Sequence, residues 1–184
     1  DFLVSVPRAG CYSYAFDENR VRNWIERNIE RYRVFGFGLW AVCLKETGEM
    51  IGDCGLTMQL IGGEIKPEIG YHIRADKQRK GYVKEAAIAV RDWTFNNTPF
   101  NIVYSYMKYT NEASIKTAMS YGCKHVDEFS AEINGITKVF AIIEACSIIS
   151  LYVSKYSPVN SCPYSTALIS SSVNLFKSSS SFCV

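Results

Sequence analysis

The residues with the clearest potential for chemistry form a basic, glycine-containing loop at positions 78–84, between a predicted strand and a predicted helix. The first turn of a helix leaves backbone N–H groups without partners and carries the positive end of the helix dipole. Glycine lets a ligand approach the backbone closely, and the basic side chains add positive charge. The pattern predicts a pyrophosphate site, although a solvated loop is the plainer interpretation of this segment taken alone. The loop residues are Gln78, Arg79, Lys80, Gly81, Tyr82, Val83 and Lys84.

A series of helices and strands must position this loop. Helical spacing of apolar residues predicts helices over 19–32 and 82–95, and a shorter helix over 111–121 ends before Gly122. Because side chains alternate along a strand, Glu68, Gly70 and His72 share one face of a strand over 68–74. The order predicts an α/β fold, with helices packed on a mixed sheet. Further strands are predicted over 39–44, 50–60, 101–107, 123–129 and 136–144, the last two joined by a turn at Asn134-Gly135.

The segment 146–184 differs from the rest of the chain in composition. It contains no Asp or Glu, and serines crowd it at 170–172 and 178–181. No helical or strand period is sustained there, and no function is assigned to it. We therefore divide the chain into a domain over 1–145 and a serine-rich C-terminal extension over 146–184. Whether the extension is an added element, a linker or a non-native reading frame is left open.

Composition argues against several classes of function. Lys and Arg number 20 against 18 Asp and Glu, so the charge balance favours neither nucleic acid nor an anionic membrane as a partner. The seven cysteines form no CxxC pair, and the two histidines have no metal-ligand spacing to them, so neither a disulfide framework nor a metal site is expected. No signal peptide pattern and no apolar run of about 20 residues is present, which favours a cytoplasmic protein.

From about Val21 to Ala145 the chain resembles the GNAT acetyltransferases, particularly the RimJ/RimL-type N-terminal acetyltransferases. In the family pattern Q/R-x-x-G-x-G/A, Gln78 and Gly81 match, whereas Val83 replaces the usual Gly or Ala. The resemblance implies a twisted, mostly antiparallel sheet with helices on both faces and a splay between two central strands; the fold's first strand is not evident here. The matching segments are GFGLWAV, TGEMIGDCGL, EIGYHI, QRKGYVKEA and NEASIKTAMSYG.

The resemblance also implies roles for individual residues. Backbone amides over 79–84 would hold the pyrophosphate of acetyl-CoA, and Asn111 and Ser114 would lie beside its pantetheine or adenosine phosphates. Without the resemblance, a plain helix N-cap is the favoured interpretation of Asn111. Glu68 resembles an acidic strand position that acts as base in several relatives, directly or through water; an exposed strand carboxylate is the alternative. A tyrosine that protonates the leaving thiolate in many relatives is Ala118 here, which leaves solvent or Ser114 as the proton donor.

The expected activity is acetyl transfer from acetyl-CoA, a co-substrate, to an amine that attacks the thioester directly in a ternary complex, without a metal. The expected acceptor is the N-terminal α-amine of a protein or peptide. A small-molecule amine such as a polyamine or aminoglycoside is the alternative, and Glu26, Glu30 and Glu64 are weak hints of an acidic groove that would suit it. A non-catalytic acyl-CoA-binding module is the alternative of a different class, and a homodimer is left open.

Overall fold

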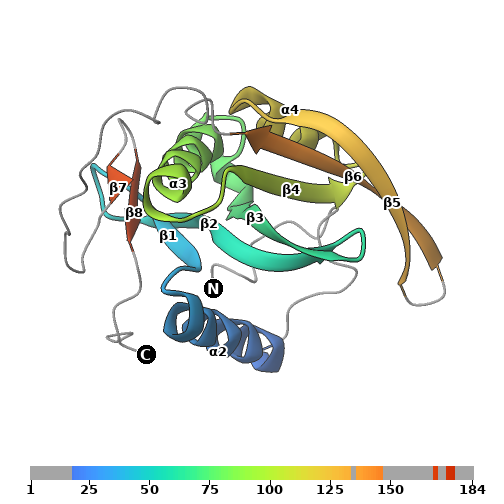
Figure 1. Cartoon of the computed structure of the whole chain (residues 1–184). Helices are drawn as coiled ribbons and strands as arrows, with labels where there is room; N and C mark the ends of the chain where they lie inside the picture. The colour runs from blue at the N-terminus through green and yellow to red at the C-terminus, as the bar shows by residue number, and fades with distance from the viewer. Residues whose placement is uncertain (1–17, 134–135, 147–167, 170–172, 177–184) are drawn as a thin grey trace, which may run out of the picture.

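The computed structural model describes residues 18–133, 136–146, 168–169 and 173–176, which form one sheet flanked by helices (Figure 1). The strands lie in the order β5-β6-β4-β3-β2-β1-β8-β7. The elements are α2 (Glu18–Phe35), β1 (Leu39–Leu44), β2 (Met50–Ile61), β3 (Glu64–Ile73), the 3-10 turn η1 (Ala75–Lys77), α3 (Tyr82–Asn97), β4 (Ile102–Lys108), α4 (Glu112–Ser120), β5 (Lys124–Ile133), β6 (Ile136–Cys146), β7 (Leu168–Ile169) and β8 (Val173–Phe176).

The predicted α/β fold is confirmed. All neighbouring strands pair antiparallel except β3 and β4, and helices cover both faces of the sheet, with α3 and α4 on one and α2 on the other (Figure 1). Predicted boundaries differ mostly by a few residues, because the ends of an element depend on contacts more than on periodicity. The strand β3 begins earlier than predicted, at Glu64, directly after a turn at Gly62 and Gly63 where both φ angles are positive. The turn predicted at Asn134-Gly135 lies outside the described residues.

Two short strands lie within 146–184, where the sequence shows no sustained period. The strand β8 pairs with β1, the neighbour of β2, and β7 pairs with β8 at the edge of the sheet. Strands of four and two residues are too short to show a period of their own. Their pairing follows from an available sheet edge, which a sequence pattern cannot reveal. The division of the chain into two parts at residue 145 stays a prediction.

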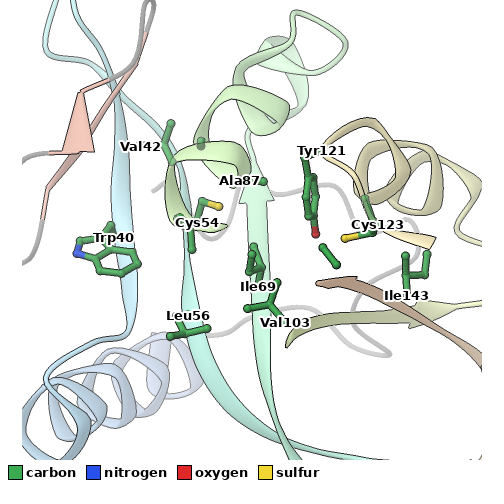
Figure 2. Close-up of a cluster of buried hydrophobic side chains, with 14 of the residues drawn as sticks. Trp40, Val42, Cys54, Leu56, Ile69, Ala87, Val103, Tyr121, Cys123 and Ile143 are labelled. Atoms are coloured by element: carbon green, nitrogen blue, oxygen red, sulfur yellow. The ribbon is translucent and has the colours of Figure 1, made fainter. Parts of the chain in front are cut away.

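The hydrophobic core lies between the sheet and the two helices α3 and α4. Its side chains come from every central strand and from both helices, and Ile69, Ala87 and Val103 are completely buried (Figure 2). Cys54 and Cys123 pack in the same cluster, as expected of small apolar side chains. This packing fixes the position of α3, and therefore of the basic loop that precedes it.

The central strands β3 and β4 separate almost as soon as they pair. Their parallel pairing consists of the single pair Glu68 and Tyr104, which confirms the predicted splay. Just beyond that pair, the Ser105 hydroxyl donates to the carbonyl of Ile69 at 2.7 Å, and the hydroxyl of Tyr121 lies 2.7 Å from the same Ser105 oxygen. Because a serine hydroxyl has one proton, Tyr121 is the donor of the second bond. A side chain therefore joins the two strands where the backbone no longer does.

This bridge leads to a stability prediction. We expect Ser105→Ala to lower the free energy of unfolding by about 1–3 kcal/mol, because it removes two buried hydrogen bonds between separate elements. Chemical denaturation followed by circular dichroism measures the change. The control is Ser130→Ala on β5, where the side chain is exposed and the expected change is within about 0.5 kcal/mol. Equal stabilities of the two variants would contradict a structural role for the bridge.

Candidate functional site

The basic loop adopts the conformation that an anion site requires. Gly81 is the N-cap of α3 with φ of 85°, and Arg79 also has a positive φ, of 60°. A Cβ atom built on Gly81 would meet nothing within 4 Å, so the space above its backbone is open. The first amides of α3, including that of Val83, have no acceptor within the helix and face the same end. The loop therefore presents backbone donors to a ligand at the positive end of the helix dipole.

Ion pairs hold the start of this loop in place. The Arg74 backbone N–H donates to Ile51 at 2.9 Å, which ties the end of β3 to β2. The Arg74 guanidinium pairs with Glu49 at 2.6 Å and with Asp76 at 2.6 Å, and Lys77 pairs with Glu49 at 3.0 Å. These contacts raise the pKa of Arg74 and lower that of Glu49, so both side chains are charged around neutral pH. The loop is therefore anchored on one side.

The other basic side chains of the loop remain available to a ligand. Arg79, Lys80 and Lys84 are exposed, and no ion pair joins them to a carboxylate among the residues that the structure describes. Gln78 is exposed beside them, and Tyr82 is half-buried. Cationic side chains beside unpaired helix amides match the chemistry of a pyrophosphate. The donor set thus fits the group that the sequence predicted for this loop.

Two of the predicted site residues, Asn111 and Ser114, lie at the start of α4. The Asn111 side chain accepts a hydrogen bond from the backbone N–H of Ser114 at 3.3 Å, so Asn111 is the N-cap of α4. The backbone carbonyl of Ser114 accepts from the hydroxyl of Tyr71 at 3.0 Å, which joins α4 to β3. Ala118 is completely buried and has no proton to give, and Tyr121 is 2% exposed with its hydroxyl on Ser105. Of these candidates, only Asn111 and Ser114 line the cleft described next.

A cleft of about 620 Å³ opens where β3 and β4 diverge. It extends from the first turn of α4 to the face of the sheet that α2 covers. Glu68, Gly70 and His72 all line it, as their predicted common face requires. Its remaining walls come from α2, β2, β4 and the hairpin of β5 and β6; the lining residues used below are Trp24, Arg27, Arg31, Thr57, Tyr106, Lys108, Phe129 and Phe140.

Glu68 is the carboxyl group of this cleft. Thr57, which lies opposite it on β2, donates a hydrogen bond to its Oε2 at 3.0 Å. Burial raises the pKa of Glu68 from 4.5 to about 7, although the hydrogen bond from Thr57 and the charges of His72 and Arg31 oppose the shift. A carboxylate with a pKa near neutrality can accept a proton and release it again at physiological pH. Its position in the cleft and its raised pKa are compatible with the predicted role of Glu68 as a base.

The raised pKa of Glu68 carries a cost in stability that depends on pH. A group whose pKa rises on folding stabilises the fold below its unfolded pKa and loses that contribution as pH rises through its folded pKa. We therefore expect Glu68→Gln to gain stability relative to the wild type between about pH 5 and pH 8, by roughly 2–3 kcal/mol. Melting curves across this range measure the difference. Glu46→Gln, in the exposed turn between β1 and β2, is the control and should show no pH-dependent gain in stability over the wild type. If the stability of Glu68→Gln and that of the wild type changed in the same way with pH, the raised pKa of Glu68 would be contradicted.

His72 forms a buried pair with a residue that the sequence analysis did not single out. Its Nδ1 lies 2.8 Å from Oδ1 of Asp53, which is 2% exposed. The second oxygen of Asp53 has no hydrogen-bond partner within the described part of the chain. Burial lowers the pKa of His72, but the charge and hydrogen bond of Asp53 outweigh it and raise the pKa above its ordinary value. The Trp24 and His72 rings meet edge to face with their centroids 6.5 Å apart, and these two residues line the cleft.

The register of β2 against β3 explains why Asp53 was missed. Asp53 lies directly opposite His72, as Thr57 does opposite Glu68, and facing residues of an antiparallel pair share one side of the sheet. Counting back from the turn at Gly62 and Gly63 would have given both pairs, had the earlier start of β3 been recognised.

No group of three or more His, Cys, Asp or Glu side chains able to hold a metal ion occurs in the described ranges. No helix among the described residues is both long and apolar enough to cross a membrane.

Comparison with known proteins agrees with the observed fold. The model of the acetyltransferase (GNAT) domain matches residues 4–124. The chain is 32% identical to the protein YkkB of Bacillus subtilis over 133 residues, which cover 72% of this chain and 75% of YkkB. Among solved structures, the ribosomal-protein-S5-alanine acetyltransferase of Vibrio fischeri superimposes with a TM-score of 0.60 at 18% identity, covering 85% of this chain and 82% of that one.

A second solved structure shows that the fold occurs with another acceptor. The spermidine N-acetyltransferase of Vibrio cholerae, in complex with CoA and spermine, superimposes with a TM-score of 0.57 at 14% identity, covering 73% of this chain and 79% of that one. At these identities both structures support the fold alone. The family model spans well over half of the chain. The chain therefore belongs to the GNAT acetyltransferase family.

Proposed function

We propose that this acetyltransferase transfers the acetyl group of acetyl-CoA to the N-terminal α-amine of a protein or peptide, by direct attack in a ternary complex. The observation that carries the proposal is the carboxyl group of Glu68, which lies in the cleft at the splay with its pKa raised to about 7. The likeness of the fold to an S5-alanine acetyltransferase is compatible with a RimJ/RimL-type acceptor, and the likeness to a spermidine acetyltransferase with a small amine.

The choice of acceptor follows from the proton that must leave before the amine can attack. An α-amine with a pKa near 8 needs about 1.4 kcal/mol to become neutral at pH 7, whereas a lysine amine near 10.4 needs about 4.6 kcal/mol. A carboxylate with a pKa near 7 can deprotonate an α-amine more readily than a lysine amine, because its basicity is close to that of the α-amine. The geometry and acidity of Glu68 therefore favour an α-amine over a lysine side chain.

Each proposed residue has a separate task. The amides over 79–84, with Arg79, Lys80 and Lys84, would hold the pyrophosphate, and Asn111 and Ser114 would lie beside the pantetheine. Bound acetyl-CoA supplies the thioester carbonyl that the amine attacks. Glu68 receives the amine proton, directly or through one water, and its hydrogen bond from Thr57 keeps the carboxyl group oriented toward the cleft. Ser114 or solvent returns a proton to the departing thiolate.

Two measurements test this function. Calorimetry with acetyl-CoA should show micromolar binding, with desulfo-CoA and ATP as controls for the thiol and the nucleotide. Release of the CoA thiol should then accelerate when peptides with a free N-terminus are added, and not when the same peptides are N-acetylated. Binding without thiol release for any amine would identify a non-catalytic acyl-CoA-binding module, and no binding by a folded sample would remove the assignment of the loop.

A further inference from the structure

We infer that the acceptor carries a carboxylate as well as its amine, and that Arg27 and Arg31 of α2 recognise that carboxylate. The inference rests on the proposed function and names the class of its acceptor. It begins from the charge of the cleft. Two arginines and one lysine line it, Arg27, Arg31 and Lys108, whereas Glu68 is the only carboxyl group among the described lining residues. His72 also lines the cleft, but it is already paired with the buried carboxylate of Asp53. Even when fully ionised, Glu68 offsets one of the three charges of Arg27, Arg31 and Lys108. The cleft is therefore positive.

The two arginines lie on the inner face of α2, four residues apart. Neighbouring arginines on the outer face have partners: Arg22 pairs with Glu18 at 3.6 Å and Arg33 with Glu30 at 2.6 Å. In contrast, no carboxylate within the described ranges pairs with either inner arginine.

Two like charges spaced by one helical turn destabilise a helix slightly, so an unbalanced pair facing a cleft suggests a ligand that balances it.

Arg31 lies near enough to Glu68 for its charge to act on that carboxyl group. The Arg31 guanidinium donates to the side chain of Asn28 at 3.3 Å, a neutral partner that leaves its charge uncompensated. That charge opposes the rise in the pKa of Glu68, and it also opposes the rise in the pKa of Tyr106 on β4. An arginine fork binds a carboxylate through two parallel hydrogen bonds, which fixes the position of the ligand as well as attracting it. The anionic group would thus be held close to the amine that Glu68 deprotonates.

The far wall of the cleft is aromatic. Tyr106, Phe129 and Phe140 form a cluster with ring centroids 5.0–6.0 Å apart. Such a wall suits an apolar side chain, because aromatic rings offer a large area of contact without a need for charge. The combined chemistry is an α-amine, an apolar body and a carboxylate. A free apolar amino acid has all three, and so does a peptide with an apolar first residue and an acidic residue next to it.

The same charges disfavour a polyamine. The acidic residues that hinted at a groove for a polycation lie elsewhere: Glu26 is exposed, Glu30 pairs with Arg33, and Glu64 pairs with Lys66 at 3.1 Å. None of these three glutamates lines the cleft. A polycation would meet Arg27, Arg31 and Lys108 with Glu68 as its single acidic partner.

The test compares acceptors that differ by one charge. Thiol release is measured with phenylalanine against phenethylamine, and with the dipeptide amide Phe-Glu-NH₂ against Phe-Gln-NH₂; spermidine is the cationic comparison. We expect kcat/KM to be roughly 10- to 100-fold higher for the anionic member of at least one pair, which is the effect of a charge-assisted pair of hydrogen bonds. The first pair reports a free amino acid and the second an acidic peptide.

Variants assign the effect to the arginines. Arg31→Gln and Arg27→Gln should each lower the ratio of anionic to neutral kcat/KM by at least about fivefold, and Arg31→Lys should restore part of it because the charge returns without the fork. Arg22→Gln, on the outer face, is the matched control and should leave the ratio unchanged. Melting temperature and acetyl-CoA affinity show that each variant is folded. Equal use of anionic and neutral acceptors, or a preference that survives both substitutions, would overturn the inference and leave the acetyltransferase function standing.

A binding measurement decides the matter even if no amine in the panel is acetylated. Calorimetry in the presence of CoA compares N-acetylphenylalanine, which keeps the carboxylate, with N-acetylphenylalanine amide, which lacks it. The inference expects tighter binding of the acid by roughly tenfold or more, and loss of this difference in Arg31→Gln. Equal affinities would overturn it. Absence of turnover together with selective binding of the acid would instead contradict the proposed function.

Discussion

Glu68→Gln is expected to lower the rate of acetyl transfer at pH 7.5 by about 10²- to 10⁴-fold, the usual contribution of a general base. The wild-type rate should rise with pH through about pH 7, where the Glu68 carboxyl loses its proton. The amide of the variant cannot accept a proton, so this inflection should disappear and leave only the titration of the amine. Initial rates of thiol release between pH 5.5 and pH 9, with saturating acetyl-CoA, measure both effects.

Two controls separate a chemical role of Glu68 from a structural one. Glu46→Gln changes the same functional group in an exposed turn and should keep the wild-type profile. Acetyl-CoA affinity of the Glu68→Gln variant should be close to that of the wild type, because Glu68 lies in the cleft and no residue of the loop over 78–84 lines that cleft. If the inflection near pH 7 persists in the variant, another group is the base.

Gly81→Val is expected to weaken acetyl-CoA binding by roughly 10- to 100-fold, which corresponds to the loss of one charge-assisted hydrogen bond. A valine resists φ of 85°, so the loop must change its backbone, and its side chain would occupy the open space above the amides. Calorimetric titration with acetyl-CoA measures the dissociation constant directly.

Gly63→Val provides the matched control for this loop. Gly63 lies in the turn between β2 and β3 with φ of 87°, and a Cβ there also meets nothing within 4 Å. The backbone cost of the substitution is therefore the same, and only the place in the fold differs. A similar loss of affinity in both variants would mean that Gly81 acts through general stability, and unchanged affinity in Gly81→Val would remove the loop from the cofactor site.

The sequence pattern was sufficient to predict the order of the elements from α2 to β6 and the position of the basic loop. Helical spacing identified α2 and α3, and the strand before Gln78 ran into a basic loop at a helix start, as the structure shows. These signals are local, because a helix period and a glycine with positive φ depend on neighbouring residues. The N-cap role of Asn111 is local for the same reason.

The acceptor side of the site depended on contacts that no local pattern contains. The face shared by Glu68 and His72 followed from alternation, but the partners Thr57 and Asp53 required the register of a neighbouring strand. The direction of Arg31 required the packing of α2 on the sheet. Strand β8 was missed because its pairing with β1 joins positions about 130 residues apart in the chain.

By itself, the sequence determined the fold family, and it predicted a loop for the pyrophosphate and a carboxyl group for the base. Only the tertiary structure decided how acidic that carboxyl group is and which charges surround it. The physical reason is that a pKa depends on burial and on nearby charges, here those of His72 and Arg31, and both are set by the approach of separate elements in space.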